Sequence, residues 1–211
     1  MNRILKKIKN VIYISVLNNI LLVSVVSVFM IGCDSDDPVK EDVPELITQV
    51  RLTFTPNGGG AAIVASANDP DGQGIQPVQV DVPIVLNAST SYALSISLIN
   101  DLANPSDPEY DISDEVLEEA EEHMFFFSWT NNVFADPVGN GNIDNRADPM
   151  NYDDDDSDGL PLGLTTSWTT AEVSSGNFRV VLKHQPDLKT ASSDANTGET
   201  DLDITFPITI E

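Results

Sequence analysis

The sequence predicts an all-β protein, a two-sheet antiparallel β-sandwich of about eight strands with one short helix and a long acidic loop. Apolar residues alternate with polar ones in many short segments between residues 50 and 210, as half-buried strands require. Glycine, asparagine, aspartate and proline separate these segments, which is typical of turns. Only one segment has helical periodicity, so the chain lacks the regular strand–helix alternation of a parallel α/β fold.

The first strands are expected between residues 50 and 98. Apolar residues occupy every second position from Val50 to Phe54, from Val78 to Val82, and from Tyr92 to Leu98. A weaker strand runs from Ala61 to Ala67, after an Asn-Gly-Gly-Gly turn that suits a hairpin. These segments provide half of the predicted sandwich.

The second half follows the only helical segment. Residues 123–130 carry three aromatic residues in phase, which we expect at the centre of the core. Further strands are expected near residues 164–168, 178–184 and 202–210. Pro207 cannot donate a hydrogen bond to a neighbouring strand, so the last strand is expected at a sheet edge.

The helical segment begins at Ser113, which we expect to cap the helix. Acidic residues fill its first turn, where the helix dipole favours negative charge. Its predicted apolar face consists of Val116, Leu117 and Ala120. More acidic residues follow, and negative charge is unfavourable at a helix C-terminus, so the helix should be short.

The N-terminal segment predicts a lipoprotein signal peptide. Residues 1–32 hold four basic residues and no acidic ones, and the apolar run Ile20–Ile31 leads into a glycine and Cys33. This order resembles the bacterial lipobox, in which the cysteine receives the lipid and becomes the new N-terminus. Met30 departs from it, because leucine is usual there. An uncleaved helix over Val11–Gly32, just long enough to span a bilayer, is the alternative.

We therefore expect a signal peptide over residues 1–32, a flexible acidic tether over 33–45 and a β-sandwich domain over 46–211. The residues Asp34-Ser35-Asp36-Asp37 resemble the acidic tag that directs lipoproteins of Bacteroidota-type bacteria to the outer face of the outer membrane. This resemblance implies a protein at the cell surface. A simple solvated tether has the same composition.

The charge of the chain excludes one class of partner. The full chain has 34 acidic and 10 basic residues, and removal of residues 1–32 changes its formal charge from −24 to −28. Phosphate recognition needs a basic surface, so nucleic acid is excluded as a ligand. The charge fits a soluble surface that attracts cations.

A wider resemblance covers most of residues 46–211. Its segments resemble small uncharacterised Bacteroidota outer-membrane lipoproteins that are thought to accompany TonB-dependent receptors. The resemblance implies a location and a receptor as partner, and little chemistry. Its segments are the strand ending at Phe54, Asp69-Pro70-Asp71-Gly72, Tyr92-Ala93-Leu94-Ser95-Ile96, Glu121-Glu122-His123, Leu160-Pro161-Leu162-Gly163-Leu164 and Lys183-His184-Gln185-Pro186.

The acidic loop within residues 131–162 is a candidate calcium site. Asp154, Asp156 and Asp158 stand at alternate positions and a glycine follows them, which is the start of a calcium-binding loop. The closing glutamate of such loops is missing, because Thr165 occupies its position. Another carboxylate of the loop would have to complete the shell. The alternative is a solvated acidic loop without metal.

The two histidines give a second candidate site. His123 and His184 are each in phase with apolar residues at strand ends, and with Glu122 they could bind a transition metal. We favour the alternative that both are polar groups at the rim of the core, since the spacing of paired ligands is absent. Simple alternation of strand directions also predicts that they lie at opposite ends of the sandwich.

The sequence therefore indicates a non-catalytic binding or interaction module, anchored by lipid at the cell surface and stabilised by calcium. The first alternative is a transition-metal or haem binder that serves a TonB-dependent receptor. The second is a glycan-active enzyme, which the sequence disfavours because it lacks the common catalytic motifs. Aromatic residues that could stack on a sugar are few, and both tryptophans are expected in the core. The candidates are Tyr110, Trp129, Tyr152 and Trp168.

Overall fold

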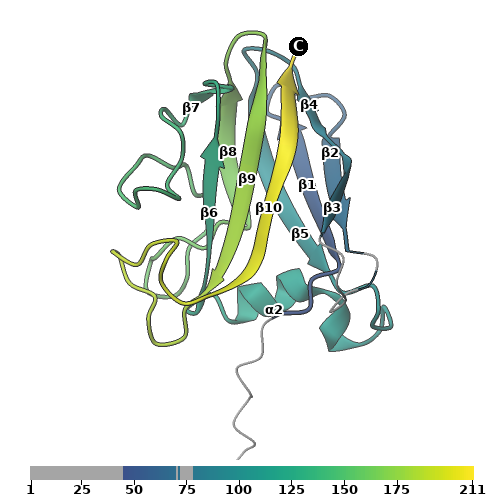
Figure 1. The fold of residues 1–211 in the computed structure, drawn as a ribbon, viewed down its shortest axis with the longest axis vertical. Helices are drawn as coiled ribbons and strands as arrows, with labels where there is room; N and C mark the ends of the chain where they lie inside the picture. Colours follow the sequence, from purple (N-terminus) through teal and green to yellow (C-terminus); the bar gives the residue numbers. More distant parts are fainter. Residues whose placement is uncertain (1–44, 70, 72–77) are drawn as a thin grey trace, which may run out of the picture. The chain divides into compact units, whose positions relative to one another are not determined.

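The computed structural model describes residues 45–69, 71 and 78–211, which belong to the compact unit Val43–Glu211 (Figure 1). Cys33, the predicted signal peptide and most of the predicted tether lie outside the described residues. Within the described ranges, no helix is long and apolar enough to cross a membrane.

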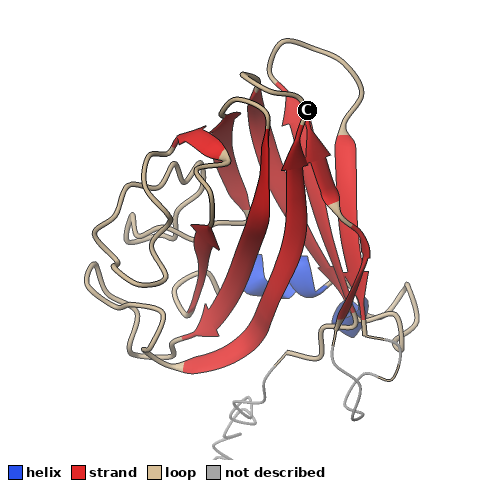
Figure 2. Cartoon of the chain, turned by 45° about the horizontal axis from the view of Figure 1, so that its top comes forward, coloured by secondary structure: helices blue, strands red, loops and turns tan. Residues whose placement is uncertain are grey.

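Two sheets pack face to face, which confirms the predicted all-β sandwich (Figures 1 and 2). One sheet has the strand order β3-β2-β1-β5-β8-β7 and the other the order β4-β10-β9-β6. Neighbours are antiparallel except β4 and β10. The strands are β1 (Gln49–Pro56), β2 (Ile63–Asn68), β3 (Gln79–Val82), β4 (Ile84–Leu86), β5 (Ser91–Ile99), β6 (His123–Trp129), β7 (Phe134–Asp136), β8 (Thr165–Thr170), β9 (Ser174–His184) and β10 (Glu199–Ile210).

The core between the sheets is aromatic, as the alternation of apolar residues predicts. Trp168 of β8 is 1% exposed and meets Phe178 of β9 edge-on, with ring centroids 5.1 Å apart. Trp129 and Phe127 of β6 also meet the Trp168 ring edge-on. Such pairs stabilise the core beyond their burial of apolar area. Both tryptophans are therefore core residues, as expected.

Strand β6 is buried on both of its faces. Phe125 and Phe127 point into the core, whereas Met124 and Phe126 form a second apolar cluster with Val181. Residues of the long acidic loop, among them Tyr152, pack on this second cluster. The loop therefore covers the outer face of β6, and part of it forms β7, which the sequence did not predict.

The helix begins two residues earlier than predicted, because its cap is Asp111 and not Ser113. In α2 (Ile112–Glu118), which follows the 3₁₀ turn η1 (Pro108–Tyr110), the cap is Asp111, whose side chain accepts a hydrogen bond from the Ser113 amide at 3.1 Å. Ser113 binds the neighbouring strand instead, because its Oγ accepts from the Leu98 amide at 2.7 Å. Val116 and Ala120 are buried as predicted, but Leu117, which was predicted on the same apolar face, is 55% exposed.

The prediction that β10 lies at an edge is wrong. It pairs with β9 on one side and with β4 on the other. Strand β4 pairs only with Ile208 to Ile210, so the ladder on that side begins just after Pro207. Pro207 therefore lies just before the residues of β10 that pair with β4. Its lack of an N–H donor does not interrupt that ladder, so an inner strand can contain it.

Candidate metal centre

The two histidines lie side by side on neighbouring strands. His123 begins β6 and His184 ends β9, and the antiparallel register pairs them directly. Their rings stack with centroids 4.6 Å apart and planes 6° from parallel. The prediction that they lie at opposite ends is wrong because β7 adds one reversal of chain direction between β6 and β9.

Each ring has a hydrogen-bonding neighbour. Nδ1 of His123 lies 3.1 Å from the backbone oxygen of Glu119, and Nε2 lies 3.7 Å from a carboxylate oxygen of Asp201. Nε2 of His184 lies 3.2 Å from a carboxylate oxygen of Glu122. Burial lowers the pKa of His123 to about 4, and the contact with the Glu119 carbonyl only partly opposes this shift. His123 is therefore neutral at pH 7.

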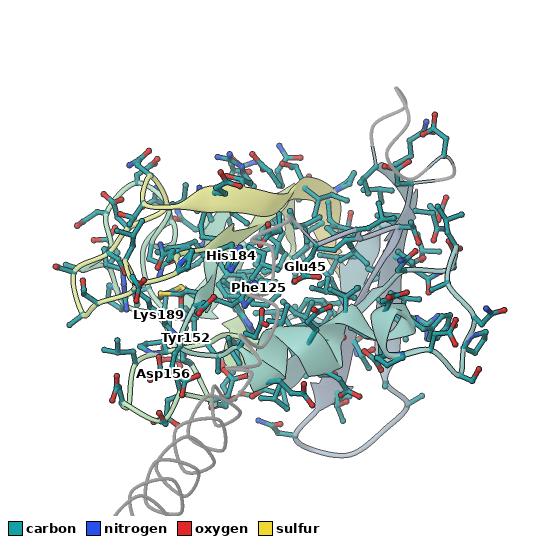
Figure 3. The ribbon with its side chains drawn as sticks, turned by 90° about the horizontal axis from the view of Figure 1, so that it is seen from below. Glu45, Phe125, Tyr152, Asp156, His184 and Lys189 are labelled. Carbon is teal, nitrogen blue, oxygen red and sulfur yellow. The ribbon has the colours of Figure 1, made fainter. Side chains whose placement is uncertain are left out.

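Two sets of possible metal ligands meet at this end of the sandwich. One ring nitrogen of His123, one of His184 and a carboxylate oxygen of Glu119 all lie within 4.8 Å of one another. Carboxylate oxygens of Glu45, Glu115 and Glu119 form a second such set. Figure 3 views this end of the fold, with His184 and Glu45 labelled.

The sequence indicated the histidines and Glu122, and the structure places Glu119 in the shared set instead. Glu119 is the C-terminal cap of α2, and its backbone amide donates to the Glu115 carbonyl. The turn after α2 leads into β6, so Glu119 lies beside His123, the first residue of that strand. Glu119 and Glu122 are both close to His123 in sequence, and this proximity alone could not show which of them lies beside both histidines.

Asp154, Asp156 and Asp158 are not brought together as a calcium-binding set. The carboxylate of Asp154 accepts hydrogen bonds from the amides of Gly163 and Thr165, at 2.6 and 2.8 Å. Among the residues described, the groups that could share a metal ion do not include these three aspartates. The carboxylates of Asp154 and Asp156 instead accept hydrogen bonds from backbone amides of the same loop.

Asp156 forms a buried ion pair that sequence reasoning missed. Its carboxylate lies 2.7 Å from Nζ of Lys189, both side chains are 1% exposed, and Nζ also donates to the Ala120 carbonyl at 2.6 Å. Burial opposes ionisation of Asp156, but hydrogen bonds from Lys189 and from the Leu160 amide outweigh it and hold the pKa below its ordinary range. Burial lowers the pKa of Lys189 despite the carboxylate.

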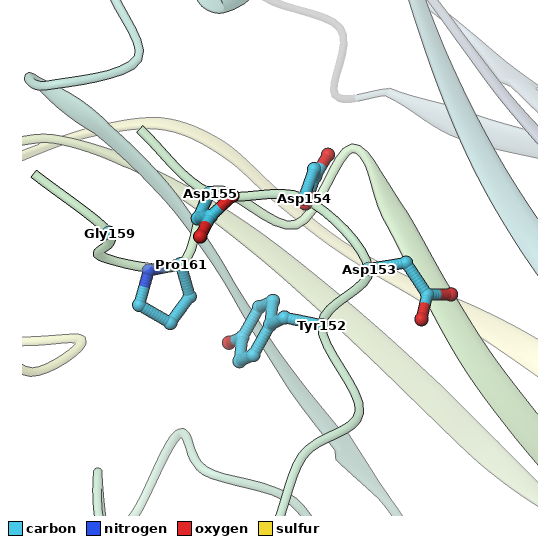
Figure 4. A pocket seen from close by; sticks show the side chains of 6 residues that line it. All are labelled: Tyr152, Asp153, Asp154, Asp155, Gly159 and Pro161. Carbon is cyan, nitrogen blue, oxygen red and sulfur yellow. The ribbon is translucent and has the colours of Figure 1, made fainter. Parts of the chain in front are cut away.

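A pocket of about 220 Å³ lies on the same loop (Figure 4). Its lining residues are Tyr152, Asp153, Asp154, Asp155, Gly159 and Pro161. Figure 4 shows the three carboxylates pointing in different directions, so they do not converge on a common centre. The Tyr152 hydroxyl donates to the Phe125 carbonyl at 2.7 Å and accepts from Asn142 at 2.8 Å. The tyrosine therefore holds the loop against β6.

Two imidazoles and one carboxylate are a donor set for zinc, copper or nickel, whereas calcium and magnesium prefer oxygen donors alone. Among the described residues, the paired histidines are the place where such donors meet. Comparison of the chain with protein-family models, curated proteins and solved structures finds no match.

Proposed function

We propose that this protein is a lipid-anchored module at the outer face of the outer membrane, which binds a ligand or a partner and does not catalyse a reaction. The observation that carries the proposal is the short path from anchor to fold. The first core strand begins at Gln49, 16 residues after the predicted lipidation site Cys33. A sandwich with its own core follows at once, as a tethered module requires.

The tether limits where the module can act. Glu45, the first described residue, follows Cys33 by 12 residues, and a fully extended chain of that length spans at most about 40 Å. The start of the folded domain therefore lies within that distance of the lipid surface, and a macromolecular partner must reach the module there. A TonB-dependent receptor, which the sequence resemblance implies, meets this condition because it lies in the same membrane.

Support for binding over catalysis comes from how the polar groups are used. In the acidic loop, Asp154 and Asp156 accept hydrogen bonds from backbone amides, and Asp156 also pairs with Lys189. Carboxylates held in this way stabilise a loop and are poorly placed to exchange protons with a substrate. The glycan-active alternative has no comparable support.

The test is fractionation of cells that express the full chain, combined with protease treatment of intact cells. We expect the wild-type protein in the outer-membrane fraction, with loss of the β-sandwich to external protease. Cys33→Ser should abolish this location, because only the thiol accepts the lipid, whereas Ser35→Ala serves as the matched control and should behave as wild type. Retention of Cys33→Ser in the membrane, or full protection of the wild type from protease, contradicts the proposal.

A further inference from the structure

We infer that Glu119, His123 and His184 form a binding site for a divalent transition-metal ion, and that such an ion is the ligand of the module. The inference rests on the proposed function for its biological setting. Its chemistry depends only on residues of the β-sandwich. Zinc is the probe that we choose, because it takes imidazole and carboxylate ligands and has no redox chemistry.

The geometry of the three residues carries the inference. Their ligand atoms all lie within 4.8 Å of one another, although the two histidines are 61 residues apart in sequence. Zinc binds imidazole nitrogen at about 2.0–2.1 Å and carboxylate oxygen at about 2.0–2.2 Å, so two ligands of one ion lie roughly 3–4 Å apart. Rotation of side chains would bring the ligand atoms to that spacing.

A second observation comes from the buried ring of His123. Its Nδ1 faces the Glu119 carbonyl, as an N–H donor would, which leaves the lone pair of the neutral ring on Nε2. Nε2 is fully buried and has no hydrogen-bond partner among the described residues, and the Asp201 carboxylate lies 3.7 Å away. A buried imidazole nitrogen without a hydrogen bond is costly in a stable core, and coordination of a metal ion would satisfy it.

The surroundings of the histidines also match those of metal ligands. Such histidines commonly use their second nitrogen to bind a carboxylate or a backbone carbonyl, which fixes the ring. Glu122 contacts His184 at 3.2 Å, and the Glu119 carbonyl contacts His123 at 3.1 Å. We therefore assign Glu122, which the sequence indicated as a ligand, to positioning of the His184 ring.

The charge around the site favours a cation. Carboxylate oxygens of Glu45 and Glu115 lie within 4.8 Å of a Glu119 oxygen, so three acidic side chains share this small volume. All three are partly buried, where the repulsion between like charges is stronger than in water. A divalent ion held by Glu119 lowers this repulsion.

Metal binding requires one local change. The two rings are 6° from parallel, and the lone pairs of parallel rings run side by side and do not converge on one point. At least one ring must therefore rotate about its Cβ–Cγ bond, a torsion that has a broad energy minimum. The inference thus predicts that zinc breaks the histidine stack, which the ring proton resonances of both histidines report by NMR.

The experiment is a calorimetric titration of zinc into the full-length protein, purified in detergent and stripped with chelator. We expect one zinc ion per chain in the wild type. Glu119→Gln and His184→Gln should each weaken binding about tenfold or more, because each removes a ligand. Glu118→Gln is the matched control, since it removes the same charge from an exposed neighbouring position and should leave the affinity unchanged. Circular dichroism confirms the fold of each variant.

The outcomes separate this inference from the proposed function. Failure of the folded wild type to bind zinc overturns the inference, and so does equal weakening by Glu118→Gln and Glu119→Gln, which would indicate binding by bulk charge. Unchanged ring resonances in the presence of bound zinc also overturn it. None of these results concerns the anchor, which the fractionation of Cys33→Ser tests independently.

Discussion

Replacing Lys189 with methionine should destabilise the protein more than most single substitutions. The change leaves the Asp156 carboxylate, 1% exposed, without its counter-ion, whereas the methionine side chain fills a similar volume. Removing one partner of a buried ion pair typically costs about 3–5 kcal/mol. For a folded unit of the size of Val43–Glu211, each kcal/mol of lost stability lowers the melting temperature by about 2–4 °C. We therefore expect a decrease of about 6–20 °C in thermal unfolding followed by circular dichroism.

A double-mutant cycle identifies the cause of that loss. Combining Lys189→Met with Asp156→Asn removes both charges and keeps a side-chain oxygen for the Leu160 amide, so the double variant should be more stable than Lys189→Met alone. Asp155→Asn is the control, because Asp155 is exposed, and it should change stability by less than about 0.5 kcal/mol. If Lys189→Met unfolds within about 0.5 kcal/mol of the wild type, the pair does not hold the loop and the reasoning is refuted.

Three further predictions concern other parts of the fold. The pKa of His123 in the folded state, about 4, lies below its ordinary value of 6.5, so the unfolded chain binds the proton first as the pH falls. In chelator, the free energy of unfolding should therefore decrease by up to about 3 kcal/mol between pH 6.5 and 4, and His123→Gln should remove that decrease. If the acidic loop binds calcium, a hundredfold excess of calcium over its dissociation constant should raise the free energy of unfolding by about 2.7 kcal/mol. Magnesium should raise it less, and Asp158→Asn should abolish the effect. Identical melting temperatures in chelator and in millimolar calcium would exclude this hypothesis. Gly141→Ala should lower the free energy of unfolding, measured in urea, by about 2–4 kcal/mol. The reason is that φ of Gly141 is +95° and an added Cβ would overlap the Phe127 carbonyl. A variant as stable as the wild type would show that the loop shifts freely.

The sequence predicted those parts of the fold that depend on local pattern. Alternation of apolar and polar residues identified the strands, and the in-phase aromatic residues of β6 identified the core. The pattern worked because one face of most strands is buried and the other is not. It gave no warning that β6 is buried on both faces, since that depends on where a loop of polar composition packs.

The candidate site was harder to predict because it depends on long-range pairing. Whether His123 and His184 meet is decided by the number of chain reversals between them, and the three-residue strand β7 is too short to show periodicity. The pair of Lys189 and Asp156 was missed for another reason. Charged residues are usually exposed, so a composition of aspartates and a lone lysine indicates a solvated loop and not a buried contact.

The most direct test of the metal site is zinc K-edge X-ray absorption of the full-length protein loaded with one equivalent of zinc. The paired histidines predict a first shell with two imidazole nitrogens and at least one carboxylate oxygen, at about 2.0–2.1 Å, with the outer-shell scattering that imidazole rings produce. A first shell made of oxygen alone would contradict the assignment, because it would place the ion among the surface carboxylates and away from His123 and His184.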